Sequence, residues 1–269
     1  MEALGAKRTN DMDASTIKKN YSKLGSALIE KLYSTDYLSI GGNESTDLLA
    51  NLAGITTNSC VLDIGSGLGG PALWLAETRQ CRVTGIDLVA SNVEEANDRA
   101  KSRGLDHLVN FECGDATVMD INSASFDVVW GQDAWCHIPD KARLIVACSG
   151  LLEQGGTIAF TDWVETKTMD NARRAELHEA TASTNMATIT QYSSYLEEGG
   201  FSILERSDIS STFVEQYRAV IERLEGFKSE ITDQFGNKVY EIMMAKNGAI
   251  LHGFEGGMIG GCRLVGRKL

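Results

Sequence analysis

The chain has 269 residues, of which 43% are hydrophobic, and its formal net charge is −12 at pH 7. This is the composition of a globular protein that can bury a core without disulfides or metal ions. Nucleic acids and anionic membranes are poor partners for it, because the sequence has no basic block to contact phosphates. It has no apolar run of the ~18 residues that a membrane span requires, and no apolar signal core at the N-terminus.

The six cysteines are scattered and form no C-x-x-C pair. Most lie in apolar runs, where a free thiol behaves as a small hydrophobic side chain. We therefore expect neither a disulfide scaffold nor a metal site, and a protein of the reducing cytoplasm. We expect it to act on a small molecule, as a monomer or homodimer.

The first 54 residues are expected to form a helical lid. Apolar side chains recur at three- and four-residue steps from about 14 to 32, which predicts one amphipathic helix. An aromatic segment follows over 33–42. Asn43 or Ser45 then caps a second helix, which ends at Gly54.

From residue 60 onward, short apolar runs alternate with helical segments, and this alternation predicts a parallel sheet covered by helices. The expected strands are 60–64, 82–88, 109–112, 126–130, 156–164, 201–208 and 262–266. The expected helices are 71–78, 92–103, 141–152, 173–181, 191–198, 213–231 and 236–251.

These elements predict an α/β fold, with a doubly wound, mostly parallel, seven-stranded sheet in one domain over 1–269. Residues 55–164 are expected to form the cofactor-binding core. Residues 165–200 are expected to be a helical insertion over the carboxyl ends of the strands, where open α/β sheets bind ligands. Residues 201–269 complete the sheet.

The glycine-rich turn after the first strand, Asp63-Ile-Gly65-Ser-Gly67-Leu-Gly69-Gly70, indicates a cofactor site. Its spacing fits both the dinucleotide pattern G-x-G-x-x-G and the G-x-G-x-G pattern of S-adenosylmethionine sites. Asp63 favours the second, because a carboxylate there suits a ligand's amino-acid end and not a diphosphate.

Two further carboxylates follow the next two strands. Asp87 lies about 20 residues after the glycine turn, where a carboxylate accepts ribose hydroxyl hydrogens in either kind of site. Asp115 follows the third strand and can accept the adenine amino hydrogens. The long helical segment before the first strand also argues against an N-terminal dinucleotide domain.

On these motifs the sequence, over about 33–164, resembles the class I S-adenosylmethionine-dependent methyltransferases. Tyr37-Leu-Ser-Ile-Gly41-Gly42 and the block 132–137 resemble phosphoethanolamine methyltransferases. The block 132–140 and the segment from 247 into the last strand resemble sarcosine/dimethylglycine methyltransferases. The resemblance implies S-adenosylmethionine as cofactor, held by Tyr37, Ser39, Asp63, Gly65, Gly67, Asp87, Leu88, Asp115, Ala116 and Gln132.

The resemblance to the phosphoethanolamine enzymes also implies a catalytic pair, His137 and Asp133. In that interpretation His137 accepts the substrate proton, and Asp133 either orients it or clamps the substrate amine. The alternative is that His137 only packs near the cofactor, while proximity and water exclusion carry the reaction.

The acceptor is less well defined. No Arg or Lys occurs from Glu176 through Ser202, which argues against a phosphomonoester. The expected pocket residues are Trp135, Trp163, Met186 and Met258, whose wall could cage an alkylated ammonium by cation–π attraction or hold a hydrophobic compound, and Arg263, which could pair with an amino-acid carboxylate. The leading prediction is N-methylation of a small amine or amino acid. The alternatives are C- or O-methylation of an aromatic or isoprenoid natural product, and a catalytically silent binding protein.

Overall fold

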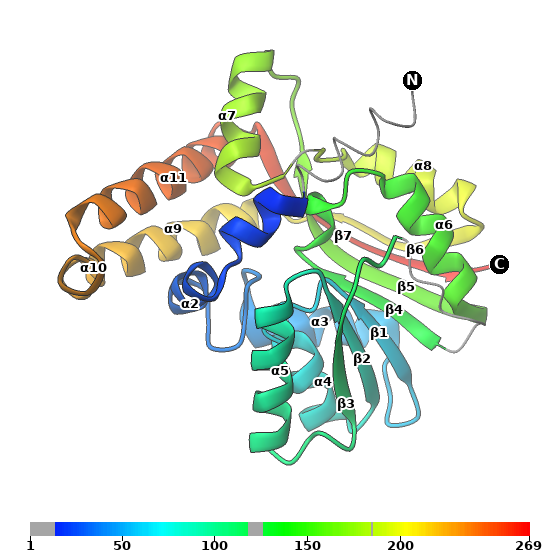
Figure 1. Cartoon of the computed structure of the whole chain (residues 1–269). Coiled ribbons are helices and arrows are strands. Elements are labelled where there is room, and N and C mark those ends of the chain that lie inside the picture. Colours follow the sequence, from blue (N-terminus) through cyan, green and yellow to red (C-terminus); the bar gives the residue numbers. More distant parts are fainter. Residues whose placement is uncertain (1–13, 118–125, 184) are drawn as a thin grey trace, which may run out of the picture.

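The computed structural model describes residues 14–117, 126–183 and 185–269 (Figure 1). Seven strands form one sheet in the order β3-β2-β1-β4-β5-β7-β6, in which β1 to β5 pair in parallel and β7 is antiparallel to β5 and β6. The doubly wound, mostly parallel sheet is therefore confirmed. The strands are β1 Cys60–Ile64, β2 Arg82–Asp87, β3 Val109–Cys113, β4 Phe126–Gln132, β5 Leu152–Glu165, β6 Phe201–Asp208 and β7 Ile259–Lys268.

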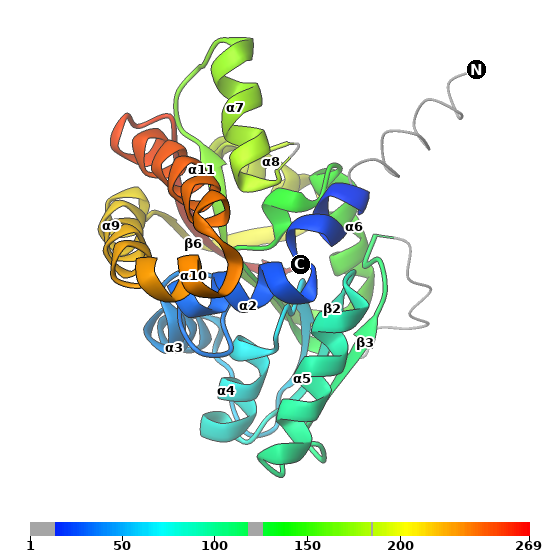
Figure 2. The same cartoon turned by 60° about the vertical axis from the view of Figure 1, so that its left-hand side comes forward.

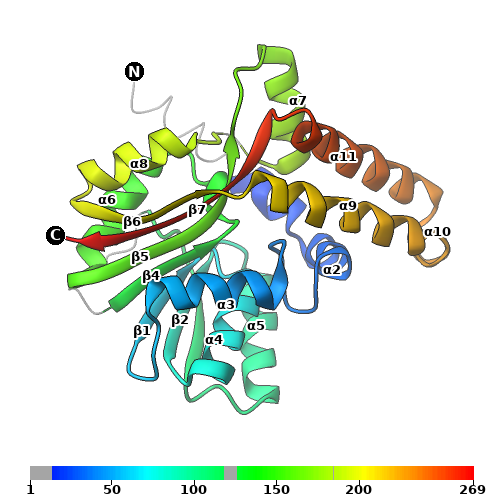
Figure 3. The ribbon, with the colours of Figure 1, turned by 180° about the vertical axis from the view of Figure 1, so that it is seen from behind.

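Helices cover both faces of the sheet (Figures 1 and 3). On one face lie α3 (Gly42–Ala53), α4 (Gly70–Arg79) and α5 (Ala90–Ser102), and on the other lie α6 (Lys141–Leu151) and α8 (Ile189–Glu198). Neighbouring residues of β1 face opposite layers: Val61 packs in the first core, Leu62 and Ile64 in the second. Burial on both sides explains why the parallel strands are continuous apolar runs.

A third apolar core lies beyond the carboxyl ends of the strands and forms a cap (Figure 2). It is built by α2 (Lys23–Leu32), α7 (Asn171–Thr181), α9 (Ser210–Gly226), α10 (Lys228–Phe235) and α11 (Asn237–Glu255). The segment 165–200, expected to be one helical insertion over the strand ends, therefore contributes to two parts of the fold. Its helix α7 belongs to the cap, while α8 covers a face of the sheet. Conversely, the segment between β6 and β7, expected to complete the sheet, supplies three cap helices.

The prediction of one helix over 14–32 is wrong. Residues 14–20 are helical, Tyr21 and Ser22 form a turn, and α2 begins at Lys23, with the Ser22 hydroxyl accepting from the Gly25 amide. A Cβ at position 25 would lie 2.0 Å from the Asn20 carbonyl oxygen. Glycine therefore lets the chain approach itself closely at this break, which an apolar periodicity cannot reveal.

Two smaller predictions also fail. The expected helix over 213–231 is divided at Gly226 into α9 and α10. Neither Asn43 nor Ser45 caps α3, whose N-cap is Gly41 at φ 91°. The Asn43 side chain instead accepts a hydrogen bond from Tyr37. Gly54 does end α3, in the left-handed conformation expected of a glycine there.

None of the helices in the described ranges is long and apolar enough to cross a membrane. All six cysteines lie in those ranges and are free. Within the same ranges no group of three His, Cys, Asp or Glu side chains could hold a metal ion.

Candidate active site

Two adjoining cavities lie at the carboxyl ends of the strands, under the cap. Cavity 1, of about 180 Å³, is lined by the ends of β1, β2 and β4, the turn after β3, and the N-terminal segment 14–21. Cavity 2, of about 160 Å³, is lined by η1 (Trp135–His137), α2, α11, the end of α7 and Trp163 of β5. Tyr21, Leu38, Asp133 and His137 line both cavities, so ligands in the two would meet at these side chains.

The glycine-rich turn after β1 forms the floor of cavity 1. Gly65, Gly67 and Gly69 all have positive φ, at 81°, 54° and 88°. A Cβ on Gly65 would lie 2.4 Å from the Cβ of Ala134, so this glycine also permits close packing against the end of β4.

Four buried polar atoms around cavity 1 have no hydrogen-bond partner in the part of the chain that the structure describes. They are Ser39 Oγ, Asp63 Oδ2, Ser66 Oγ and Gln132 Nε2. Buried polar atoms are seldom left unpaired, so a polar ligand is the expected partner. Burial, and secondarily the neighbouring Asp87, raise the pKa of Asp63 to about 8. An ammonium group of a ligand would stabilise the ionised Asp63 carboxylate and so lower this pKa.

Asp87 closes one side of cavity 1. Its Oδ2 accepts from the Gly67 amide at 2.8 Å, and its Oδ1 accepts from the Val89 amide at 2.9 Å. Burial nevertheless raises the pKa of Asp87. Asp115 is exposed at the mouth, where Oδ1 accepts from the Thr117 amide and hydroxyl at 2.9 and 2.7 Å.

Cavity 1 gathers nearly all of the residues expected to hold the cofactor. Tyr37 is the exception, since it is only 2% exposed and its hydroxyl donates to Asn43 Oδ1 at 2.8 Å. Tyr37 therefore anchors α3 and does not line the cavity. The residues that do line it are Ser39, Asp63, Gly65, Gly67, Asp87, Leu88, Asp115, Ala116 and Gln132.

Asp133 lies directly after β4 in the left-handed conformation, with φ 55°. Thr161 donates to its Oδ1 at 2.7 Å, and the Ile40 amide donates to its Oδ2 at 3.1 Å. Burial raises the pKa of Asp133 to about 7, although these two hydrogen bonds oppose the shift. Neither partner is His137, so the geometry does not support the interpretation of Asp133 as its orienter.

His137 is oriented instead by the backbone and by Tyr21. Its Nδ1 lies 3.1 Å from the Ala182 carbonyl oxygen, which can only accept, so Nδ1 carries the hydrogen. Nε2 is then the acceptor for the Tyr21 hydroxyl, 2.9 Å away. Burial lowers the pKa of His137 to about 4 and raises that of Tyr21, so both side chains are neutral at pH 7.

Cavity 2 is mostly apolar and aromatic, with Tyr21, Tyr33 and Trp163 in its walls. Among its described lining residues, Lys246 of α11 is the one Lys or Arg side chain. Its Nζ donates to Asn20 Oδ1 at 2.9 Å, and burial lowers its pKa. The sequence contains no local motif around Lys246, so only the cap brings it to the site.

Of the expected acceptor residues, only Trp163 lines a cavity. Trp135 is fully buried, where its Nε1 donates to the Ile64 carbonyl oxygen at 3.2 Å. Met186 is buried in the cap core. Met258 contacts Arg173 through its sulfur, and Arg263 is 3.6 Å from Glu205. These four side chains serve packing or ion pairing at the positions where the structure places them.

Residues 62–160 match the family model described as a methyltransferase domain. The chain is 29% identical over 206 residues to the 27-O-demethylrifamycin SV methyltransferase of Amycolatopsis mediterranei, covering 75% of each protein. It is 27% identical over 221 residues to phosphoethanolamine N-methyltransferase 1 of Arabidopsis thaliana, covering 82% of this chain but only 44% of the plant protein.

Solved structures share the fold. Phosphoethanolamine N-methyltransferase 2 of Haemonchus contortus, in complex with phosphomonomethylethanolamine and S-adenosylhomocysteine, superposes with a TM-score of 0.87 at 22% identity. The match covers 95% of this chain and 60% of the nematode protein. The chain thus spans less than two thirds of the length of two of these three relatives. These comparisons identify a methyltransferase domain over residues 62–160, in the fold of the S-adenosylmethionine-dependent enzymes.

Proposed function

We propose that the chain methylates the nitrogen of a small amine or amino acid, with S-adenosylmethionine in cavity 1 and the acceptor in cavity 2. The observation that carries this proposal is the junction of the two cavities, where Asp133 and the hydrogen-bonded Tyr21–His137 pair lie. A nucleophile in cavity 2 would meet the donor at this junction. At the junction, Asp133 supplies a carboxylate, and the neutral side chains of Tyr21 and His137 form a hydrogen-bonded pair that can relay a proton.

The residues of cavity 1 fit the donor. The unpartnered Asp63 carboxylate suits its ammonium group, and the unpartnered Ser39, Ser66 and Gln132 atoms offer further polar partners. Asp87 and Asp115 line the same cavity and can accept hydrogen bonds from ribose hydroxyl and adenine amino groups. S-adenosylmethionine, when bound, supplies a methyl group on a sulfonium sulfur that needs no further activation.

The residues of cavity 2 fit a small charged acceptor. Its volume of about 160 Å³ is close to that of an engineered cavity of ~150 Å³ that accepts benzene. Asp133 and the aromatic rings of Tyr21, Tyr33 and Trp163 favour a cationic amine. Lys246 would pair with an acidic group elsewhere on the acceptor, such as an amino-acid carboxylate.

The proton released from the acceptor has two possible destinations on this chain. Asp133, with a pKa of about 7, is balanced between its two protonation states at neutral pH and can both attract an ammonium and accept a proton. The Tyr21 hydroxyl can take a proton while passing its own to His137 Nε2. The pKa of His137, about 4, makes this second path the weaker one in the empty site.

A second candidate is O- or C-methylation of a larger natural product. The mostly apolar lining of cavity 2 supports it, as does the similarity to the rifamycin enzyme. The small volume and the half-buried Lys246 argue against it, because a bulky neutral acceptor would leave that cation without an acidic partner.

The free thiols are typical of a reducing compartment, so the proposal includes a cytoplasmic enzyme, acting as a monomer or homodimer. Size-exclusion chromatography with light scattering would determine which of the two forms is present.

The test is an acceptor panel of amines, amino acids, phosphobases, phenols and macrolide-type alcohols, incubated with S-adenosylmethionine and analysed by mass spectrometry. N-methylated products from small acidic amines are expected. Products only from phenols or large alcohols would replace the first candidate with the second. Binding of S-adenosylhomocysteine without any product from any acceptor would favour the silent binding protein.

A further inference from the structure

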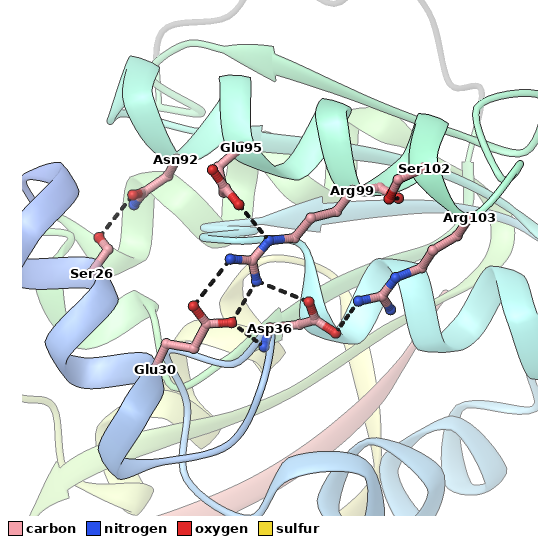
Figure 4. Close-up of polar contacts among 8 residues, drawn as sticks. All are labelled: Ser26, Glu30, Asp36, Asn92, Glu95, Arg99, Ser102 and Arg103. Atoms are coloured by element: carbon pink, nitrogen blue, oxygen red, sulfur yellow. Dashed lines mark hydrogen bonds and ion pairs between the residues drawn. The ribbon is translucent and has the colours of Figure 1, made fainter. Parts of the chain in front are cut away.

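Ser26 lies in the first turns of α2, just after the break that separates this helix from residues 14–20. Its side chain is buried, and its hydroxyl lies 3.1 Å from the Tyr21 carbonyl oxygen and 2.8 Å from Asn92 Oδ1. Figure 4 shows the second contact, which joins α2 to α5. The one hydroxyl hydrogen of Ser26 is therefore shared between the backbone of Tyr21 and a residue of the cofactor-binding core.

Asn92 is 2% exposed and lines cavity 1. Because its Oδ1 faces the Ser26 hydroxyl, its amide NH₂ is the group that can donate, and Asn92 lowers the pKa of Asp87, which lines the same cavity. A continuous polar path thus runs from Asp87 through Asn92 and Ser26 to Tyr21, whose hydroxyl contacts His137. It connects the wall of cavity 1 with the proton relay.

An ionic cluster beside this path fixes α2 itself (Figure 4). Arg99 of α5 contacts both carboxylate oxygens of Glu30 at 2.6 and 3.0 Å, and Asp36 at 2.9 Å. Arg103 contacts Asp36 at 2.6 Å. These side chains are largely buried, and the Glu30 contact is bidentate, which is the strongest arrangement for such a pair. The cluster anchors α2, so movement at the break is left to residues 14–21.

We propose that Ser26 and Asn92 are positioning residues that place Tyr21 over the two cavities in response to a donor bound at Asp87. The inference rests on the proposed function, because it requires that Asp87 contact the donor. Ala14, Ile17 and Tyr21 all line cavity 1, so the segment they belong to covers a bound donor directly. Donor binding and placement of Tyr21 are then linked, and each must strengthen the other.

The experiment uses the full chain, with S-adenosylhomocysteine as the probe. Its affinity is measured by titration calorimetry, and hydrogen exchange of 14–22 and 23–32 is followed with and without it. The variants are Ser26→Ala, Asn92→Ala and their combination. The matched control is Asn97→Ala, since Asn97 lies on the same helix but bonds to the backbone of Phe111 and contacts neither the path nor a cavity.

In the wild type, the probe is expected to slow exchange in 14–22, while 23–32 is protected throughout by the ionic cluster. Ser26→Ala should abolish the probe-induced protection and weaken binding about fivefold, the usual effect of one hydrogen bond. Asn92→Ala should weaken binding roughly tenfold, because Asp87 also loses a partner. The double variant should match Asn92→Ala alone, since both changes cut one path.

Asn97→Ala should keep affinity and protection within about twofold while lowering the melting temperature, as expected for lost hydrogen bonds at a structural position. The inference is overturned if Ser26→Ala responds to the probe like the wild type, or if Asn97→Ala behaves like Asn92→Ala. Additive effects in the double variant would also overturn it. A wild type that binds no S-adenosylhomocysteine would instead refute the proposed function.

Discussion

Cavity 1 and cavity 2 share four residues but are built in different ways. The walls of cavity 1 come mainly from turns that directly follow β1, β2, β3 and β4, so each contact is encoded within a few residues of a strand end. The walls of cavity 2 come from α2, η1, the end of α7 and α11, which are far apart in the sequence. Turns fixed by strand geometry form cavity 1, the proposed donor site, and helix packing forms cavity 2, the proposed acceptor site.

The two cavities also differ in charge. Carboxylates surround cavity 1, at Asp63, Asp87 and Asp115, whereas the lining of cavity 2 is mostly apolar apart from Asp133, His137 and Lys246. Enzymes of one family can therefore bind the same donor in a site like cavity 1, while differences among their cap helices select different acceptors. The predictions below test whether the two cavities act separately and meet only at the junction.

The largest effect is expected at the junction itself. Tyr21→Phe and His137→Ala should each lower kcat by roughly 10²- to 10⁴-fold if the pair moves the acceptor's proton, and the double variant should be no worse than either single one. Steady-state kinetics with the best acceptor measures this. His107→Ala, which changes an exposed histidine, is the control. Near-normal kcat in both variants would leave Asp133 as the proton acceptor, or proximity and water exclusion alone as the mechanism.

The pH–rate profile distinguishes the two possible bases. If Asp133 must be ionised, the acid limb lies near pH 7 and disappears in Asp133→Asn. If His137 accepts the proton, the limb lies near pH 4 and disappears in His137→Ala.

The next largest effect is expected in cavity 1. Asp87→Ala should weaken S-adenosylhomocysteine about 10- to 100-fold, because it removes a buried, charge-assisted acceptor and leaves the Gly67 and Val89 amides unpaired. Calorimetry gives the affinity. Tyr37→Phe serves as the comparison, since it should cost about 1 kcal/mol of stability and leave the affinity unchanged. If Tyr37→Phe weakened S-adenosylhomocysteine more than Asp87→Ala does, Tyr37 would be a donor-binding residue.

A more moderate effect is expected in cavity 2. Lys246→Met should raise KM for an acidic acceptor about tenfold at nearly constant kcat, because it removes a charge-assisted contact but none of the junction residues. Lys238→Met, at an exposed position of α11, is the matched control. An equal rise in KM for a neutral acceptor would contradict the charge pairing.

The smallest effect is expected in the stability of the ligand-free protein. The pKa of Asp63 is raised in the folded state to about 8, so its contribution to stability is complete below pH 4 and is lost as the pH rises through 8. Asp63→Asn should therefore raise the melting temperature at pH 8 by about 2–4 °C for each kcal/mol recovered, and have little effect at pH 4. Calorimetric scans at both pH values test this, and a lower melting temperature for the variant at pH 8 would contradict it.

Much of the sheet could be predicted because each strand carries its own signal. β1 and β6 begin and end at the expected residues, and the carboxylates Asp63 and Asp87 lie at strand ends where the sheet brings them together. The helical segments were harder to place. The break at Tyr21–Ser22 depends on a close backbone approach at Gly25, and the residues on either side of it continue the same apolar spacing.

The sequence alone determined the doubly wound sheet, the glycine turn and the donor-site carboxylates, because these depend on local backbone geometry and on the parallel direction of neighbouring strands. Only the tertiary structure decided that Tyr21 meets His137, that Lys246 lines the same cavity as Tyr21, and that Trp135 is a core residue. Tyr21 and His137 are 116 residues apart. Such contacts arise when helices pack by shape and burial, and no residue pattern in either segment records which partner it will meet.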